Sequence, residues 1–370
     1  MTTSDTKWSS AQPGPVGTHT WFEIQQQPAL WQTTAICVRE AISRLKLQPK
    51  LKDARAIITG AGTSAYASAA VSSAWPRSLA VSSTDLLLAT ERYLEDVTVL
   101  VSLARSGNSP ESMAVVERVH RFRPDVWHLA ITCNSEGALA NSLLVKPIIL
   151  DPRTNDQSLV MTSSFSNLTL AGLCLAKGDV MDQAIASAAG RADTVFALLN
   201  ERMRNLANRI EDRVVLLGSP ALFGWAQEGA LKVLEMTAGR FPVMAETYLA
   251  LRHGPMSFVR PNTAVICLLS NDRAVRLYEE DLVRELRKKK LGYLVGICRD
   301  GDIDQTDGPL FDEVIPPVLS EVPDNLRTPF EILGPQLFGY HLSVRAGLNP
   351  DNPSPSGVIN RVVQGIRIYN

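Results

Sequence analysis

The chain has few of the features that mark secreted, membrane-spanning or metal-binding proteins. Its five cysteines lie far apart with no C-x-x-C pair, so neither a disulfide framework nor a zinc ribbon is indicated. No apolar run approaches the ~20 residues that cross a bilayer. The polar segment 1–17 also lacks the apolar core of a signal peptide. We therefore predict a cytoplasmic protein with no membrane segment.

An excess of either charge is also missing. The 37 Lys and Arg residues against 38 Asp and Glu leave a net charge of -1, whereas a dedicated nucleic-acid-binding protein concentrates positive charge. This balance still permits a small anionic ligand, because one pocket needs only a few donors. With 370 residues, 45% of them hydrophobic, the composition is that of a globular protein of about two domains.

Short apolar runs recur along the chain and predict the fold class. Runs at 55–59, 97–103 and 127–132 are typical of parallel strands covered on both faces, and the helical pattern between them indicates an open α/β sheet. The series then returns in three later runs, 213–217, 264–269 and 293–298. We predict two copies of one doubly wound unit. They form a first domain over 51–200 and a second over 201–370, after an N-terminal helical extension over 1–50.

The glycine turn after the first predicted strand allows three interpretations. The segment 60–65 fits G-x-G-x-x-A, the fingerprint of a dinucleotide-binding turn, and Asp85 lies at the expected distance beyond it. A tight turn with no ligand is the second interpretation. We favour the third, a phosphate or sugar site, because a helix N-terminus offers unpaired N–H groups. The residues expected to bind there are Gly62, Thr63 and Ser64.

A second polar loop follows the next strand along the chain. Ser106, Asn108 and Ser109 crowd the start of a helix, and Arg105 precedes them. Helix capping by Ser109 is one explanation. However, doubly wound sheets bind ligands at the carboxyl ends of neighbouring strands, and a third polar segment beginning at Thr162 could close over the same place. Together these groups predict a cradle for one dianion.

The helix predicted over 224–240 carries a narrow charged stripe. On a helical wheel Glu228, Lys232 and Glu235 fall within about 60°, and apolar residues occupy nearly all the rest. Buried charge is costly unless it is paired or used. The stripe is therefore either a structural ladder of ion pairs or a catalytic site. We favour catalysis because His253, in a turn before Gly-Pro, follows soon after. The other histidines show no ligand spacing with it, so we predict no metal.

The combination of these motifs resembles the sugar isomerase (SIS) family over most of residues 50–370. The loops at 60–64 and 106–109, and the block from Glu228 to the His253-Gly-Pro turn, are similar to that family's motifs. The resemblance implies two tandem SIS domains, each with a parallel sheet of flavodoxin-like type. It also implies a homodimer or higher homo-oligomer that shares its active sites.

The isomerase half of glucosamine-6-phosphate synthase suggests roles for the residues. There the serine loops hold the sugar phosphate, and a glutamate at the position of Glu235 moves a proton between C1 and C2. A histidine at the position of His253, from the partner subunit, assists ring opening. Glu228 and Lys232 match further polar residues of that site. The relative also has a tail lysine that forms a Schiff base, whereas Arg361 or Gln364 stands at its place here.

The whole pattern is most similar to the tagatose-6-phosphate ketose/aldose isomerase group, which is associated with galactosamine-6-phosphate deamination. The resemblance thus implies an enzyme that acts on a hexose or hexosamine 6-phosphate and requires no cofactor. We expect Glu235 to act as the base and Lys232 to stabilise negative charge. Isomerisation without deamination, and sugar-phosphate binding without catalysis, are the alternatives.

Overall fold

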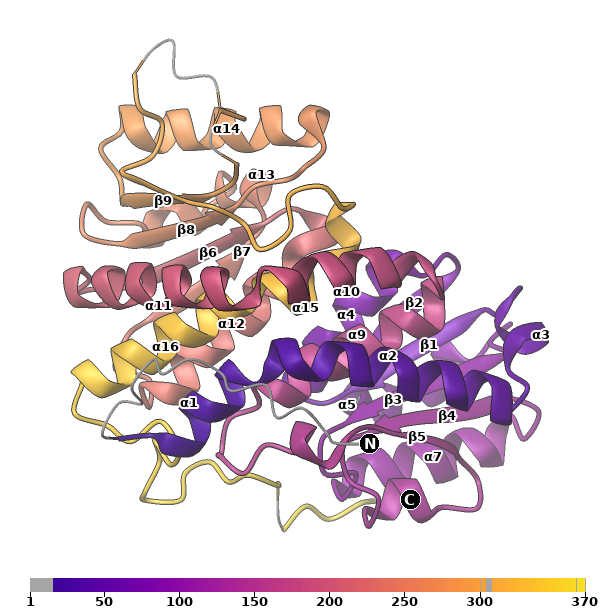
Figure 1. Ribbon diagram of the computed structural model, residues 1–370. Helices are drawn as coiled ribbons and strands as arrows, with labels where there is room; N and C mark the ends of the chain where they lie inside the picture. The colour runs from indigo at the N-terminus through magenta and orange to yellow at the C-terminus, as the bar shows by residue number, and fades with distance from the viewer. Residues whose placement is uncertain (1–15, 300, 304–307, 364, 370) are drawn as a thin grey trace, which may run out of the picture.

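Each half of the chain builds a five-stranded parallel sheet (Figure 1). The computed structural model describes residues 16–299, 301–303, 308–363 and 365–369. The strand order is β2-β1-β3-β4-β5 in the first sheet and β7-β6-β8-β9-β10 in the second. Both are the 2-1-3-4-5 order of flavodoxin-like sheets, so the predicted fold class and its repetition are confirmed. The strands are β1 (Ala56–Gly60), β2 (Ser78–Ser82), β3 (Val99–Ala104), β4 (Trp127–Thr132), β5 (Lys146–Ile149), β6 (Val214–Gly218), β7 (Val243–Glu246), β8 (Ala264–Leu268), β9 (Tyr293–Ile297) and β10 (Glu313–Ile315).

The six predicted apolar runs are the inner strands of the two sheets. The four strands that the sequence pattern misses, β2, β5, β7 and β10, are all edge strands. Each of these has partly exposed positions. An edge strand therefore lacks the continuous apolar run that a strand covered on both faces shows.

Helices cover both faces of each sheet. Those of the first half are α1 (Thr18–Gln25), α2 (Gln27–Arg44), α3 (Gln48–Leu51), α4 (Thr63–Ala74), α5 (Ser83–Leu88), α6 (Thr90–Tyr93), α7 (Pro110–Phe122), α8 (Ala138–Asn141), α9 (Ser163–Lys177), α10 (Val180–Gly190) and α11 (Ala192–Arg209). Those of the second half are α12 (Phe223–Met236), α13 (Tyr248–Leu251), α14 (Arg273–Lys288), α15 (Thr328–Glu331) and α16 (Leu333–Arg345). Among the described residues, every helix is too short or too polar to cross a bilayer.

One hydrophobic core lies between the two sheets and joins the halves. Alternate side chains of the inner strands, such as Ile58 and Leu216, contribute to it, together with α4, α9, α12 and α16. The opposite faces of the sheets have separate, smaller cores. Full burial of one large apolar side chain, such as Phe165, stabilises the fold by ~1.5–3 kcal/mol. Because such residues come from both halves, packing couples the two sheets.

The helices before β1 belong to the same core. Trp21 and Trp31 are buried in it, α2 packs against α9, and α1 packs against α16. Helices do form within residues 18–51, but their packing does not set them apart as an extension. The domain boundaries near residues 50 and 200 stay predictions.

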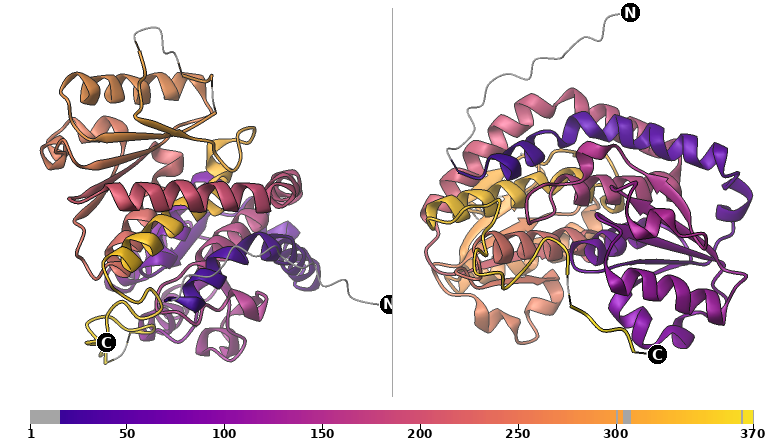
Figure 2. Two further views of the ribbon diagram at one scale, coloured as in Figure 1. Left: turned by 60° about the vertical axis from the view of Figure 1, so that its left-hand side comes forward. Right: turned by 90° about the horizontal axis from the view of Figure 1, so that it is seen from below.

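The carboxyl-terminal tail returns from the second half to the first. After α16 it runs past the helices and ends beside α7 (Figures 1 and 2). Hydrogen bonds near both ends of the tail attach it to the first half. Leu159 donates its N–H to the carbonyl of Asp351 at 3.0 Å, and Arg118 Nη2 donates to the carbonyl of Tyr369 at 3.1 Å.

Candidate active site

The charged stripe lies on α12, at the boundary between the halves. The helix ends at Met236, short of the predicted residue 240, because Ala238 and Gly239 adopt positive φ angles of 48° and 73°. Gly229 lies inside the stripe's motif, and a Cβ there would come within 2.5 Å of Leu216 Cδ2. Glycine at this position therefore lets α12 lie close against β6.

Lys232 connects two carboxylates with the first half of the chain. Its Nζ lies 2.6 Å from Glu235 Oε2 and 3.3 Å from Glu228 Oε1. The same Nζ donates to Thr63 Oγ1 at 3.3 Å, and that hydroxyl donates to Glu228 Oε1, also at 3.3 Å. Thr63 is the first residue of α4. The structure thus brings the charged stripe and the glycine turn together.

Burial sets the protonation of this cluster. Glu228 and Lys232 are both fully buried. Burial raises the pKa of Glu228 to about 8, although the charge of Lys232 opposes this rise. Burial also disfavours the charged form of Lys232, but the two glutamates outweigh that effect and its pKa is raised. Lys232 therefore stays an ammonium, while Glu228 is protonated more readily than an exposed carboxylate.

Glu235 is the accessible carboxylate of the stripe. Its side chain is 24% exposed, whereas those of Glu228 and Lys232 are 0% exposed. The ladder of ion pairs that the sequence suggested does form, but one end of it is open to solvent. Of the two glutamates, Glu235 is therefore the one that a substrate can reach.

The glycine turn presents its donors at the start of α4. Gly62 precedes the helix with φ 54° and ψ -127°, a backbone conformation that favours glycine. A Cβ built on Gly62 would meet nothing within 4 Å. Space therefore lies beside the first N–H groups of the twelve-residue α4, where an anion is stabilised. Thr63 and Ser64 are buried next to it.

The loop after β3 uses some of its predicted donors internally. Asn108 Oδ1 accepts the N–H of Ala138 at 2.9 Å, and Ser106 Oγ accepts the N–H of Asn108 at 3.3 Å. Ser109 makes no side-chain cap on α7, and its hydroxyl donates to Glu111 Oε2 at 2.5 Å. The capping explanation is therefore wrong for this side chain. The hydroxyl of Ser106 can still donate its proton to a ligand.

Asp156 occupies the helix N-terminus that begins at Thr162. The N–H groups of Thr162, Ser163 and Ser164 donate to its carboxylate at 2.9, 3.0 and 2.9 Å. The hydroxyls of Thr162 and Ser164 donate to it as well, at 3.3 and 2.5 Å. The start of α9 already holds an anion from the chain itself. These contacts correct the prediction that Thr162 closes over a phosphate, because its donors are already used.

The guanidinium of Arg105 is also engaged elsewhere. Arg105 is buried, and its Nη1 donates to the carbonyls of Ser158 and Leu159 at 3.4 and 3.0 Å, while Nη2 donates to the carbonyl of Arg361. A direct grip on phosphate would need these donors to leave their carbonyls. The expectation that Arg105 lines the phosphate cradle is therefore corrected to a role in holding neighbouring backbone.

His253 lies near the carboxyl edge of the second sheet, on the face opposite to the one that α12 covers. It is exposed, and it lines a cavity of about 540 Å³ between α13 and α14, together with Ser219 and Tyr278. Within the described residues, no hydrogen bond or ion pair connects its ring with α12. A single chain therefore does not join His253 to the stripe.

Two residues near the site were not predicted. Tyr66 lies one helical turn after Thr63, and burial, reinforced by the charges of Glu228 and Glu235, raises the pKa of its phenol. The i, i+3 spacing from Thr63 could have revealed it. Asp156 lies six residues before Thr162, and an acidic residue just ahead of a run of hydroxyl residues at a helix start is the signal that could have revealed it. In the described part of the chain, no cluster of three or more His, Cys, Asp or Glu could hold a metal ion.

Proteins of known name are similar to this chain over nearly its whole length. It is 36% identical over 370 residues to the D-galactosamine-6-phosphate deaminase AgaS of Shewanella sp., covering 94% of this chain and 90% of the relative. It is 34% identical over 379 residues to that of Escherichia coli, covering 96% and 97%. No family model matches the chain.

A solved structure agrees with these relatives. The tagatose-6-phosphate ketose/aldose isomerase from Escherichia coli matches with a TM-score of 0.85 at 29% identity, over 98% of this chain and 99% of that one. The SIS resemblance and its tagatose-6-phosphate isomerase group are thus confirmed. Because the AgaS relatives exceed 30% identity across more than nine-tenths of it, the chain belongs to the AgaS family of sugar-phosphate enzymes.

Proposed function

We propose that this chain is a galactosamine-6-phosphate deaminase that releases ammonia and tagatose 6-phosphate by transferring a proton from C2 to C1. The names of the AgaS relatives supply the substrate class. The observation that carries the proposal is the contact of Lys232 with both Glu235 and Thr63, at 2.6 and 3.3 Å. It puts an accessible carboxylate, an ammonium and a helix N-terminus beside one another.

The phosphate binds where donors remain for it. These are the N–H of Thr63 at the start of α4, the hydroxyl of Ser64 and the hydroxyl of Ser106, because the N–H groups of Ser64 and Ala65 donate to carbonyls of the turn. Binding at this end directs the sugar carbons toward the stripe on α12. The dinucleotide interpretation of the glycine turn has no support among the relatives, which are sugar-phosphate enzymes.

Glu235 acts as the base on the open-chain sugar. Its carboxylate removes the C2 proton, and the electron pair moves to form an enolamine whose developing charge on O1 is stabilised by Lys232. O1 takes a proton from the ammonium group on C2, and return of the first proton to C1 then leaves a protonated imine at C2 and a hydroxymethyl group at C1. Water adds to the imine carbon, and the adduct expels ammonia to leave the ketose. Glu228 keeps Lys232 and Thr63 in place.

His253 assists ring opening from a second copy of the chain. Its exposure and its separation from the stripe within one chain support this arrangement. Mixing two inactive variants, Glu235→Gln and His253→Ala, tests it. Hybrid dimers that carry one intact site should recover about a quarter to a half of wild-type activity, whereas activity absent from every mixture would place both residues in the same chain's site.

An assay panel of hexose and hexosamine 6-phosphates, with both ketose and ammonia measured, tests the function. Galactosamine 6-phosphate should release one ammonia for each ketose formed. Turnover of tagatose 6-phosphate to galactose 6-phosphate without an amino substrate would favour the isomerase, which the match to the Escherichia coli isomerase structure suggests as the second candidate. Ligand-induced stabilisation without turnover would identify a binding protein and contradict the proposal.

A further inference from the structure

Arg105 joins three segments that are far apart in the sequence. It follows β3 in the loop of Ser106, and its Nη1 reaches the turn at 155–159 through the carbonyl of Leu159 at 3.0 Å. Its Nη2 reaches the carboxyl-terminal tail through the carbonyl of Arg361. One side chain therefore connects a substrate-binding loop, a turn and the tail.

The buried charge of Arg105 is not balanced by an ion pair. Within the described residues, no carboxylate lies within 4.0 Å of its guanidinium, although it is only 6% exposed. A buried charge of this kind costs stability. Its planar fork, however, presents donors in fixed, divergent directions, which a lysine ammonium does not. The surrounding carbonyls lie in different segments, and the fork reaches all of them because its N–H groups point in different directions.

The tail itself reaches back to the same turn. Arg361 Nε donates to the carbonyl of Asp156 at 2.9 Å, and its Nη2 donates to Asn155 Oδ1 at 2.8 Å. Arg105 and Arg361 thus form reciprocal contacts between the turn and the tail. The carboxylate of Asp156 in turn caps α9, so the turn is held firmly on its other side.

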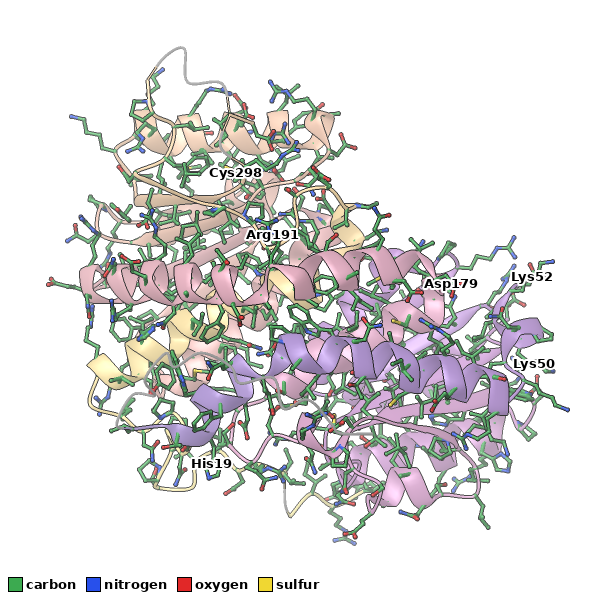
Figure 3. All side chains as sticks on the ribbon, in the orientation of Figure 1. His19, Lys50, Lys52, Asp179, Arg191 and Cys298 are labelled. Atoms are coloured by element: carbon green, nitrogen blue, oxygen red, sulfur yellow. The ribbon has the colours of Figure 1, made fainter. Side chains whose placement is uncertain are left out.

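A second attachment lies nearer the start of the tail. The carboxylate of Asp351 accepts the N–H groups of His19 and Thr20 at 3.2 and 2.7 Å, and Figure 3 shows His19 beside this part of the tail. The carbonyl of Asp351 accepts the N–H of Leu159. The segment 351–361 is therefore attached to the first half at both ends, and only the later attachment involves a substrate-binding loop.

We propose that Arg105 is a positioning residue that fastens the carboxyl-terminal tail to the loop of Ser106, so that the tail holds this loop in its substrate-binding conformation. The effect on substrate rests on the function proposed above, whereas the fastening does not. Loss of the fastening leaves the reacting groups on α12 intact and weakens only the binding of the phosphate end. KM therefore rises, and kcat changes little.

Amide hydrogen exchange of the ligand-free protein tests the fastening without reference to activity. Arg105→Lys keeps the charge but loses the fork, and Arg361→Gln breaks the contact from the tail. Both variants should increase exchange of the amides of Leu159 and Gly357 at least tenfold, because these N–H groups are hydrogen-bonded in the turn and the tail that the two arginines join. The double variant should equal either single one. Arg118→Gln is the matched control, because Arg118 holds only the end of the tail at Tyr369. It should leave exchange of the amides of Leu159 and Gly357 unchanged.

Kinetics then separate positioning from direct binding of phosphate. Under the proposal, Arg105→Lys and Arg361→Gln each raise KM about tenfold with kcat within threefold of wild type, and their effects are not additive. The proposal would be overturned if Arg105→Lys kept both the wild-type KM and the wild-type exchange. It would also be overturned if Arg105→Gln raised KM while exchange stayed unchanged. Failure of the proposed function would appear instead as no turnover in the wild type, with the exchange pattern intact.

Discussion

The carboxyl edges of the two sheets have the same topology but opposite electrostatic arrangements. At the first edge, the glycine turn after β1 leaves the N–H of Thr63 and the hydroxyl of Ser64 without an acceptor among the described residues, next to open space at Gly62. At the second edge, the corresponding donors already bind carboxylates of the chain. Glu279 accepts the hydroxyl of Ser219 and the N–H of Ser270, the latter at 2.7 Å. Asp324 accepts the hydroxyl of Ser270 and the N–H of Asn271.

This difference shows how a repeated fold comes to have one phosphate site. At the second sheet, the acidic side chains of Glu279 and Asp324 occupy the loop donors that follow β6 and β8, as a phosphate would. The second half contributes α12 instead, whose stripe meets the first edge at Thr63. One copy thus binds the anion and the other supplies the reactive groups.

The largest expected effect is on kcat, and it comes from replacing one carboxylate at each edge and comparing the two variants. Glu235→Gln removes the proposed base, and kcat should fall by about 10²–10⁴-fold, with KM changed much less because the phosphate contacts remain. Deuterium exchange at C2 of the substrate should stop as well. Glu279→Gln, the matched change at the second edge, should keep kcat within twofold. Near-normal turnover by Glu235→Gln would remove it from the role of base.

The second effect is on the pH dependence of stability. The folded pKa of Glu228 is about 8, above its ordinary value of 4.5, so the folded state binds this proton more tightly than the unfolded state. Its contribution is complete below about pH 4.5 and is lost as the pH rises through 8. Relative to Glu228→Gln, the wild type should lose up to about 1.4 kcal/mol of unfolding free energy per pH unit in this window.

Urea unfolding at pH 5, 6, 7 and 8 measures this loss. Glu279 provides the comparison at the second edge, because burial raises its pKa to about 7. The loss of unfolding free energy due to Glu279 should end at a lower pH than that due to Glu228, and Glu279→Gln should abolish it. Parallel stability curves for wild type and Glu228→Gln would show that Glu228 is ionised throughout.

The smallest effect compares two serines in corresponding loops. Ser106→Ala removes a donor to the substrate phosphate, and KM should rise about tenfold, because a hydrogen bond to a charged group contributes ~1.5–3 kcal/mol. Ser270→Ala removes a donor to Asp324 and should lower stability by about 1 kcal/mol while kcat/KM stays within twofold. Equal KM values for the two variants would mean that the first edge does not hold the phosphate.

The inner strands were predictable because burial on both faces leaves a continuous apolar run, and α12 was predictable because its burial leaves a narrow charged stripe. The edge strands were not, because their exposed positions interrupt such a run. Among the site residues, Glu228, Lys232 and Glu235 come together through helical spacing alone, and Thr63 meets them through the contact of α4 with α12. The contacts of Arg105 could not be predicted, because its acceptors lie in distant segments, whereas Asp156 lies in the loop directly before Thr162.

The sequence by itself determined the repeated inner strands of two α/β sheets, a glycine turn at a helix N-terminus and a charged stripe on an otherwise apolar helix, since each depends on local spacing and composition. The tertiary structure decided which polar groups remain for a ligand. Asp156 occupies the start of α9, and backbone carbonyls occupy Arg105. A donor binds whichever acceptor the fold brings nearest, and for Arg105 those acceptors come from segments distant in the chain.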